Sequence, residues 1–545
     1  MITVKFCSLR HAFLAGFISA TCMSAYSQDV LWEKSYGGKQ ADYLFDAIAT
    51  PDNGYILAGS SLSNKTGNKT QENQGNLDYW IWKMNGKGEL EWQKSFGGSG
   101  ADLLRSIKPT NDGGYILGGS SESAKGAQKK DANKGQYDYW IIKLNAKGNE
   151  EWQITLGGKG QDELHSVSQT SDGGYILGGS SSSGKIPVEN KGKEDPYGKS
   201  EAGFGNLDYW VVKLDSKRKI EWQRTLGGQY SDMLRSIEQT RDGGYILGGY
   251  SNSPESGNKT EKCHGSGDYW VIKLDKGGST EWQKTYGGDK DDQLYAICQT
   301  LDGNYVAAGN SSSGSTGNKN TGNKNGTDFW VVKLAEGGEA IWQKTYNIGN
   351  VDFLISMVEN SDGSLLLGGY AQSEIVGNNK KKDNEGINDY VAIKIAEDGK
   401  ELWNQTVGSG GEDILRKVIE IRDGGYLLAG TSNGVPSKDR YSSIGSQDFW
   451  VVKLKDKEKK KERISMIEAS PNPTQQFTNV IVGYEYEKGT CNVFDLSGRL
   501  MQTFAIKDTM IPIDLGAFPE GIYVIEIRTN IQNDGIKVVK TINKN

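Results

Sequence analysis

The chain has 545 residues and a formal net charge of -6 at pH 7, with a sequence pI near 5.5. This acidic balance argues against a nucleic-acid partner, because nucleic-acid binders usually carry a basic bias. The five cysteines are widely spaced and form neither a disulfide framework nor a zinc pattern. Side-chain packing is therefore expected to hold the fold.

Residues 1–27 are typical of a secretory signal peptide. Basic residues precede an apolar stretch, and Ala25 and Ser27 occupy the minus-three and minus-one positions before the expected cleavage point. Cys22 leaves a lipoprotein anchor as the alternative, although its preceding residues fit a lipobox poorly. No later segment has the roughly 18 unbroken apolar residues of a membrane span, so we expect no membrane-spanning segment in the mature chain.

From residue 28 to residue 454 one unit recurs seven times. A phrase such as EWQKTYGG contains Trp32, Trp92, Trp152, Trp222, Trp282, Trp342 and Trp403. A second phrase, DYWVVKL, contains Trp80, Trp140, Trp210, Trp270, Trp330 and Trp450, with Val391 in the remaining copy. A fixed period of this size determines the architecture.

Each unit holds four short runs rich in Ile, Val, Tyr and Trp, bounded by Gly, Asn and Asp, which predicts four strands. The Asp-Gly pair of phrases such as NDGGY favours a tight hairpin between the first two. Seven such sheets predict an all-β, seven-bladed β-propeller. The first phrase of the mature chain is a fourth strand and the last unit ends on its third, so an N-terminal strand would close the last blade. An open solenoid is the alternative, but neither end carries a capping unit.

The large aromatic residues are expected to pack between blades rather than to stack on a ligand. The turns within TxDGGY are uniform and predict one regular face. The opposite face carries the long Gly, Asn, Lys and Ser-rich loops, which we expect to be mobile and solvated. Such loops are a favoured place for partner recognition, unless they vary only because nothing constrains them.

Two series of aspartates flank the loop face. They are Asp42, Asp102, Asp162, Asp232, Asp292, Asp352 and Asp413, and Asp78, Asp138, Asp208, Asp268, Asp328, Asp389 and Asp448. Gathered carboxylates could hold calcium. We favour side-chain caps on loop amides instead, and therefore expect no cofactor.

The copies differ three residues after the first aspartate of each unit. This position holds Phe45, Arg105, His165, Arg235, Tyr295, Ile355 and Arg416. It lies on the innermost strand, where guanidinium groups could bind the carboxylates or phosphates of an acidic sugar or acidic peptide. The structural alternative is that these side chains pack between blades and extend their polar ends to solvent.

No catalytic constellation stands out. His165 and His264 are the histidines beyond the leader, and Cys263 beside His264 has no evident orienting partner. No triad, carboxylate pair or nucleotide loop is recognisable, so an enzyme is disfavoured, with a glycan-active hydrolase or lyase as the alternative.

A charge run at residues 455–463 predicts a linker to a small Ig-like β-sandwich at residues 464–545. This domain resembles the type A C-terminal sorting domain of the type IX secretion system of Bacteroidota. The resemblance is carried by Pro471, Asn472, Pro473, Asp495, Gly498, Arg499, Gly521, Tyr523, Lys537 and Lys540. It implies transport across the outer membrane by the secretion machinery, and removal of the domain by a sortase-like peptidase.

The sequence thus predicts a secreted or surface-attached propeller that binds an unknown glycan or protein. A glycan-active enzyme and a structural surface-layer protein remain the alternatives.

Overall fold

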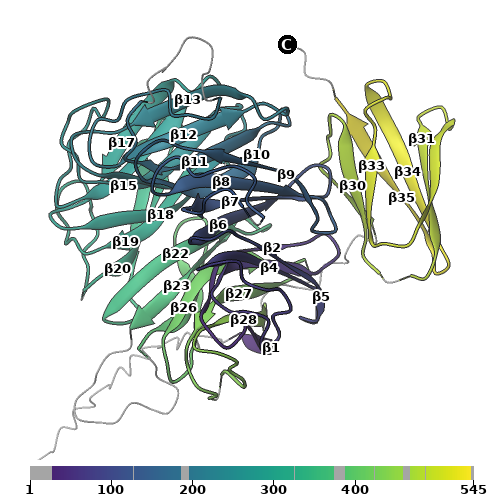
Figure 1. Cartoon of the computed structure of the whole chain (residues 1–545), viewed down its shortest axis with the longest axis horizontal. Helices are drawn as coiled ribbons and strands as arrows, with labels where there is room; N and C mark the ends of the chain where they lie inside the picture. The colour runs from purple at the N-terminus through teal and green to yellow at the C-terminus, as the bar shows by residue number, and fades with distance from the viewer. Residues whose placement is uncertain are drawn as a thin grey trace, which may run out of the picture.

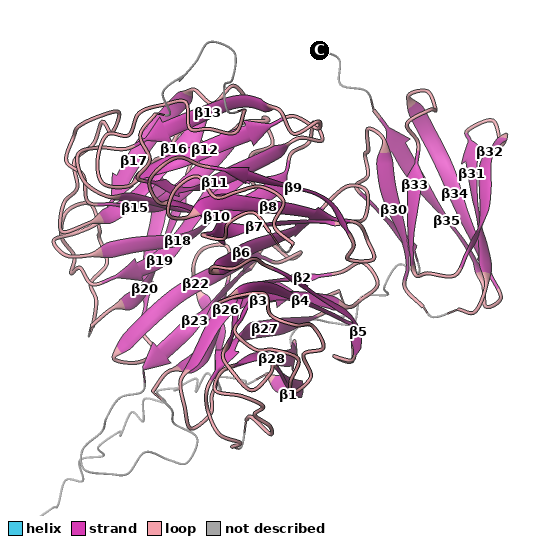
Figure 2. Ribbon diagram, in the orientation of Figure 1, coloured by secondary structure: helices cyan, strands magenta, loops and turns pink. Residues whose placement is uncertain are grey.

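The computed structural model describes residues 28–541 except 127, 186–195, 325, 373–386, 423, 438, 458–466 and 485. The expected leader and most of the expected linker lie outside this part. The described residues form strands and turns, with no helix and therefore none that could cross a membrane (Figure 2). The all-β prediction is confirmed.

Seven antiparallel sheets of four strands form the large domain (Figure 1). The inner strands are β2 (Asp42–Ala49), β6 (Asp102–Pro109), β10 (Asp162–Gln169), β14 (Asp232–Gln239), β18 (Asp292–Gln299), β22 (Val351–Glu359) and β26 (Asp413–Glu420). The second strands are β3 (Tyr55–Ser61), β7 (Tyr115–Ser121), β11 (Tyr175–Ser181), β15 (Tyr245–Ser251), β19 (Tyr305–Ser311), β23 (Leu365–Gln372) and β27 (Gly425–Ser432).

The third strands are β4 (Asp78–Met84), β8 (Asp138–Leu144), β12 (Asp208–Leu214), β16 (Asp268–Leu274), β20 (Asp328–Leu334), β24 (Asp389–Ile395) and β28 (Asp448–Lys455). The outer strands are β5 (Leu90–Phe96), β9 (Glu150–Leu156), β13 (Ile220–Leu226), β17 (Thr280–Tyr286), β21 (Ala340–Tyr346), β25 (Glu401–Val407) and β1 (Asp29–Tyr36). Each sheet is one blade, numbered here from one, beginning with β2 to β5.

The last blade takes its outer strand from the N-terminus. Its strand order is β1-β28-β27-β26, and Ser35 of β1 lies opposite Trp450 of β28. Inner strands contact their neighbours in sequence around the ring, and β26 and β27 of blade 7 contact β2 of blade 1. The predicted closure of the last blade by the N-terminal strand is confirmed.

Inner strands have one edge without a strand partner, and the neighbouring blade satisfies part of it. The amide of Leu44 donates to Thr431 Oγ1 of blade 7 at 2.9 Å, and the amide of Leu104 donates to Ser60 Oγ of blade 1 at 2.9 Å. Leu164, Leu234 and Leu354 repeat this bond with Ser120, Ser180 and Asn310. Because a buried amide without a partner is costly, these bonds fix the spacing of adjacent blades.

Tryptophans of the DYWVVKL phrase are fully buried between blades, as predicted. The Tyr79 hydroxyl donates to the Trp140 carbonyl of the next blade at 3.2 Å, and the two rings lie 4.8 Å apart. Four further blade junctions repeat this bond. At the junction of blades 5 and 6 both partners are replaced, the tyrosine by Phe329 and the tryptophan by Val391.

Turns on the regular face are capped by the following blade. Gln169 Oε1 accepts from the amide of Asn111 at 2.8 Å, and Gln239, Gln299, Glu359 and Glu420 do the same in later blades. The turn of blade 1 is an exception. Pro51 stands at the position of Asn111 and has no amide hydrogen, and Pro109 stands at the position of the capping Gln169. At the junction of blades 7 and 1, Ala49 stands where a cap for Arg422 is expected.

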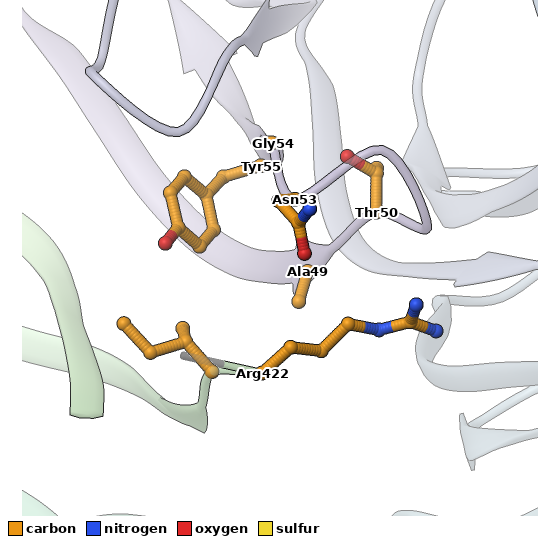
Figure 3. A pocket seen from close by; sticks show the side chains of 7 residues that line it. Ala49, Thr50, Asn53, Gly54, Tyr55 and Arg422 are labelled. Atoms are coloured by element: carbon orange, nitrogen blue, oxygen red, sulfur yellow. The ribbon is translucent and has the colours of Figure 1, made fainter. Parts of the chain in front are cut away.

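A cavity of about 30 Å³ occupies this place, lined by Ala49, Tyr55, Ile421 and Arg422 among others (Figure 3). We predict that Ala49→Gln fills this cavity and caps the Arg422 amide. The free energy of unfolding should rise by about 1 kcal/mol, the net value of one hydrogen bond. Chemical denaturation measures the change. Ala49→Leu is the control, because it fills space without an acceptor, and equal stabilities of the two variants would contradict the cap.

Blade 7 extends beyond the expected boundary at residue 454. Asp456 is buried and pairs with Lys394 Nζ at 3.2 Å. In blades 1 to 4 the corresponding lysine instead pairs with a glutamate of its own outer strand, for example Lys273 with Glu281 at 2.9 Å. In blade 6 that glutamate is replaced by Leu402. The first residues of the predicted linker therefore belong to the ring, because they supply the missing carboxylate.

The C-terminal domain is a sandwich of two sheets. One has the order β29 (Ile467–Ser470), β30 (Phe477–Val482) and β33 (Met510–Asp514). The other has the order β32 (Leu500–Ile506), β31 (Gly489–Asp495), β34 (Gly521–Thr529) and β35 (Asn533–Lys540). Val480, Cys491, Ile511 and Ile525 lie in their shared core. The predicted sandwich is confirmed.

Candidate functional site

Buried side chains anchor the loops of the variable face to the ring, while most of the described loop residues are exposed or partly exposed, as expected. Each of five loops buries a lysine to 2% exposure or less, namely Lys69, Lys129, Lys199, Lys259 and Lys319. Blade 7 buries Arg440 at the same place. The asparagine before the lysine also bonds: Asn258 accepts from the Gly227 amide at 2.8 Å and donates to the Thr225 carbonyl at 2.9 Å.

The aspartates of this face cap amides and surround the buried lysines. In blade 4, Asp232 Oδ2 accepts from the Gly228 amide at 2.7 Å and from Ser253 Oγ at 2.9 Å. Asp268 Oδ2 accepts from the His264 amide at 2.6 Å. Burial raises the pKa of Asp268 to about 7, and Lys259 opposes the shift. The Lys259 ammonium thus places a positive charge near these carboxylates.

We predict that Lys259→Met destabilises the protein by about 3–5 kcal/mol at pH 8, because it leaves two buried carboxylates without a cation. Adding Asp268→Asn should recover part of the loss. Chemical denaturation checks both, with Lys262→Met on the same loop as the exposed control. A loss no larger than that of the control would show that the buried lysine carries no such role.

The position at which the copies differ is a β-bulge on every inner strand. Register shifts fall between Leu44 and Asp46 in blade 1, and at the corresponding place in the other six blades. The bulged residues are Phe45, Arg105, His165, Arg235, Tyr295, Ile355 and Arg416, all of them partly buried. A bulge redirects one side chain without breaking the sheet, so the identity of this residue is not constrained by strand pairing.

The bulged residues come together at the axis of the ring. We call the group the axial cluster, and it consists of Phe45, Arg105, His165, Arg235, Tyr295 and Arg416. The guanidinium carbon of Arg105 lies 4.4 Å from the centre of the Phe45 ring, and that of Arg416 lies 5.5 Å from it. The Arg235 guanidinium lies 5.4 Å from the Tyr295 ring. Aromatic rings thus position all three cations, which come from blades 2, 4 and 7.

Positive charge at the axial cluster is incompletely compensated. In the described part of the chain, no carboxylate lies within 4.0 Å of the guanidinium of Arg105, Arg235 or Arg416. Burial lowers the pKa of Arg105, Glu163 opposes this shift, and the charges of Arg416 and Arg235 add to it.

His165 is the member of the cluster whose protonation responds to its surroundings. Burial and then the charges of Arg235 and Arg105 lower its pKa well below the usual value, so the imidazole is neutral at pH 7. Its Nε2 lies 3.9 Å from Glu163 Oε2. An anion bound to the arginines would oppose both cationic effects and raise this pKa.

A second charged layer lies deeper along the inner strands, and the sequence reasoning missed it. Lys417 Nζ lies 3.3 Å from Asp46 Oδ1, and Asp46 Oδ2 accepts from the Ile107 amide at 3.0 Å. Burial raises the pKa of Glu238 to about 7, while nearby Lys108 opposes the shift. These charges stand where other copies carry Ser, Ala or apolar residues, and that departure was the available signal.

Cys263 and His264 do not form a catalytic pair. The Cys263 thiol donates to the Ser251 carbonyl at 3.0 Å, and burial raises its pKa to about 11, so the thiolate is not populated at neutral pH. No group of three His, Cys, Asp or Glu side chains in the described residues could hold a metal ion.

Motif residues of the C-terminal domain stabilise its turns and edges. Asn472 accepts from the Val539 amide at 2.9 Å and donates to the Lys537 carbonyl at 2.8 Å. Asp495 accepts from the amides of Ser497 and Arg499 in the β31–β32 turn, where Gly498 has a φ of 80°. Tyr523 donates to the Pro519 carbonyl. Lys540 is buried and donates to carbonyls of Leu515, Gly516 and Phe518.

Residues 469–542 match the family model of the secretion system C-terminal sorting domain. The C-terminal domain is a type IX sorting domain. A sorting domain of this kind directs the chain out of the cell, to the cell surface or into the medium. The predicted recognition and localisation are therefore confirmed.

The chain is distantly similar to several other proteins. A stretch of 162 residues is 25% identical to the regulatory protein FlaEY of Caulobacter vibrioides, and covers 28% of this chain and 17% of that protein. A fungal alcohol oxidase shares 10% identity at a TM-score of 0.42, with 94% of this chain and 100% of that one covered. PorZ, a surface component of the type IX secretion system of Porphyromonas gingivalis, shares 10% identity at a TM-score of 0.21 over 94% and 86%. No functional inference follows from likenesses this distant.

Proposed function

We propose that this exported protein is a binding module whose propeller binds an acidic group of a glycan or protein ligand at the axial cluster. The sorting domain carries the ring to the cell exterior, and a sortase-like peptidase then removes that domain. Arg105, Arg235 and Arg416 bind the anion, while Phe45 and Tyr295 hold the guanidinium groups in place.

One observation carries this proposal. Three guanidinium groups converge from separate blades, and no described carboxylate lies within 4.0 Å of any of them. Their pairs with aromatic rings contribute about 0.5–2 kcal/mol each, which is less than a carboxylate or phosphate would supply in a partly buried place. A ring serving structure alone has no need of three like charges at its centre, because apolar residues would pack there at lower cost.

The arginine-to-alanine triple variant, Arg105→Ala with Arg235→Ala and Arg416→Ala, tests the site. We expect retention on a glycan and protein array to weaken by at least about 100-fold, because charge-assisted hydrogen bonds are lost. The variant loses three ring contacts of about 0.5–2 kcal/mol each, and relief of the repulsion among the three cations offsets part of this loss, so the ring should stay folded.

The matched control removes the same charge from exposed lysines of the loop face, as Lys39→Ala, Lys159→Ala and Lys290→Ala together. If both triple variants lose binding equally, the ligand responds to general positive charge and the axial assignment is wrong.

Removing residues 464–545 tests the route of export. The truncated chain should stay in the periplasm as a folded ring, because the sorting signal is gone while all seven blades remain. Cell fractionation and surface labelling measure the distribution. Normal surface delivery of the truncated chain would overturn the role of the sorting domain in this protein.

A further inference from the structure

The side chains on the two sides of the axial cluster differ in chemistry, and this difference narrows the class of ligand. Resting on the proposed function, we propose that it binds a chain end, an anionic terminal group on an apolar stem that enters from the loop face, rather than an internal segment of a polyanion.

A layer of apolar side chains precedes the arginines on the way in from the loop face. It consists of the residues two positions before the bulge, namely Tyr43, Leu103, Met233, Phe353 and Ile414, with polar Glu163 and Gln293 in the two remaining blades. All seven are partly buried. We call these residues the collar.

The collar shares a strand face with the axial cluster. The Tyr295 hydroxyl donates to Gln293 Oε1 at 3.3 Å, and Glu163 lies 3.9 Å from His165, so residues two apart on one strand are neighbours. The collar is nearer the loop face, because it follows closely on the aspartate near the start of the inner strand that caps a loop amide, as Asp232 caps Gly228. A ligand that reaches the arginines from this face therefore passes the collar.

Paired charges lie on the other side of the axial cluster, in the deeper layer. Asp46 is 6% exposed, pairs with Lys417 and accepts the Ile107 amide, so its charge is already compensated. Lys108 and Glu238 form a second group of opposite charges at this depth. A ligand that displaced these pairs would leave buried charges unpaired, at a cost of several kcal/mol. The anionic group therefore stops at the arginines.

These two boundaries distinguish an end from an internal segment. An internal segment of a polyanion continues in two directions from the bound group. Its next charges would lie against the five apolar collar residues, where desolvation is unfavourable. A terminal carboxylate or phosphate on an apolar stem places its charge on the arginines and its stem on the collar. Hydrophobic contact then adds to the binding of the anion.

The experiment is a titration of the full mature chain, with ¹³C-labelled histidine, observed by NMR. The carboxylate probes are acetate and hexanoate, and the phosphate probes are inorganic phosphate and phenyl phosphate. Polygalacturonate of high chain length is the internal polyanion. His165 reports the axial cluster, because a bound anion raises its pKa, while His264 on the loop face serves as the internal reference.

We expect hexanoate and phenyl phosphate to shift His165 at concentrations at least about tenfold lower than acetate and inorganic phosphate, since their stems bury apolar area. The two pairs of probes show whether the preferred end is a carboxylate or a phosphate. Leu103→Asn with Ile414→Asn should reduce the preference for a stem, because it replaces two of the five apolar collar residues.

Tighter binding of polygalacturonate than of the stem-bearing probes would overturn the end-on mode, even if the arginine-to-alanine triple variant loses that binding and so supports the proposed function. Equal affinity of probes with and without a stem would also overturn it. These comparisons use the unmodified chain, so they hold even where the collar variant does not fold. The proposed function itself fails separately, if the arginine-to-alanine triple variant still binds its array ligand.

Discussion

The ring depends on how neighbouring blades satisfy the free edges of the inner strands. Each inner strand exposes amides that no strand of its own sheet can pair, and hydroxyl groups such as Ser60 of the preceding blade accept them. This arrangement works only in a closed ring, because the amide of Leu44 in blade 1 needs Thr431 of blade 7. The pairing of β1 with β28 completes blade 7 and so supports the contacts between blades 7 and 1.

Closure also explains where variation is tolerated. Tyr79 and Trp140 pack against each other across a junction. Phe329 and Val391 replace both partners at one junction, and Phe449 packs on the retained Trp80 at another, so these positions stay apolar. The bulged residue escapes this constraint, because it adds a side chain at the axis without altering the pairing on either side of it. The bulged position can therefore carry arginine in some copies while the residues packed between blades stay alike. The binding role that we propose depends on these arginines.

Much of this arrangement was predictable from the sequence, because repetition of two tryptophan phrases fixes the blades and the truncated first unit predicts closure. The bulge was not, since the shift at Leu44 depends on the alignment with a partner strand. The anchoring of the loops was missed, because the sequence around Lys259 is as polar as that of a fully solvated loop. It does not reveal that the lysine is buried near two carboxylates. Asp46 and Lys417 belong to different copies, and only the closed ring makes them neighbours.

The most direct test of this account is hydrogen exchange on the ring with and without β1, comparing the intact chain with one that lacks residues 29–36. The account predicts that removing β1 exposes the amides of β28 first, and that β26 and β2 lose protection together, because the bond from Leu44 to Thr431 spans the opened junction. Blades 3 and 4, on the far side of the ring, should keep most of their protection. Unchanged protection of β2 and β26 in the shortened chain would contradict the account, since closure by β1 would then not hold the ring.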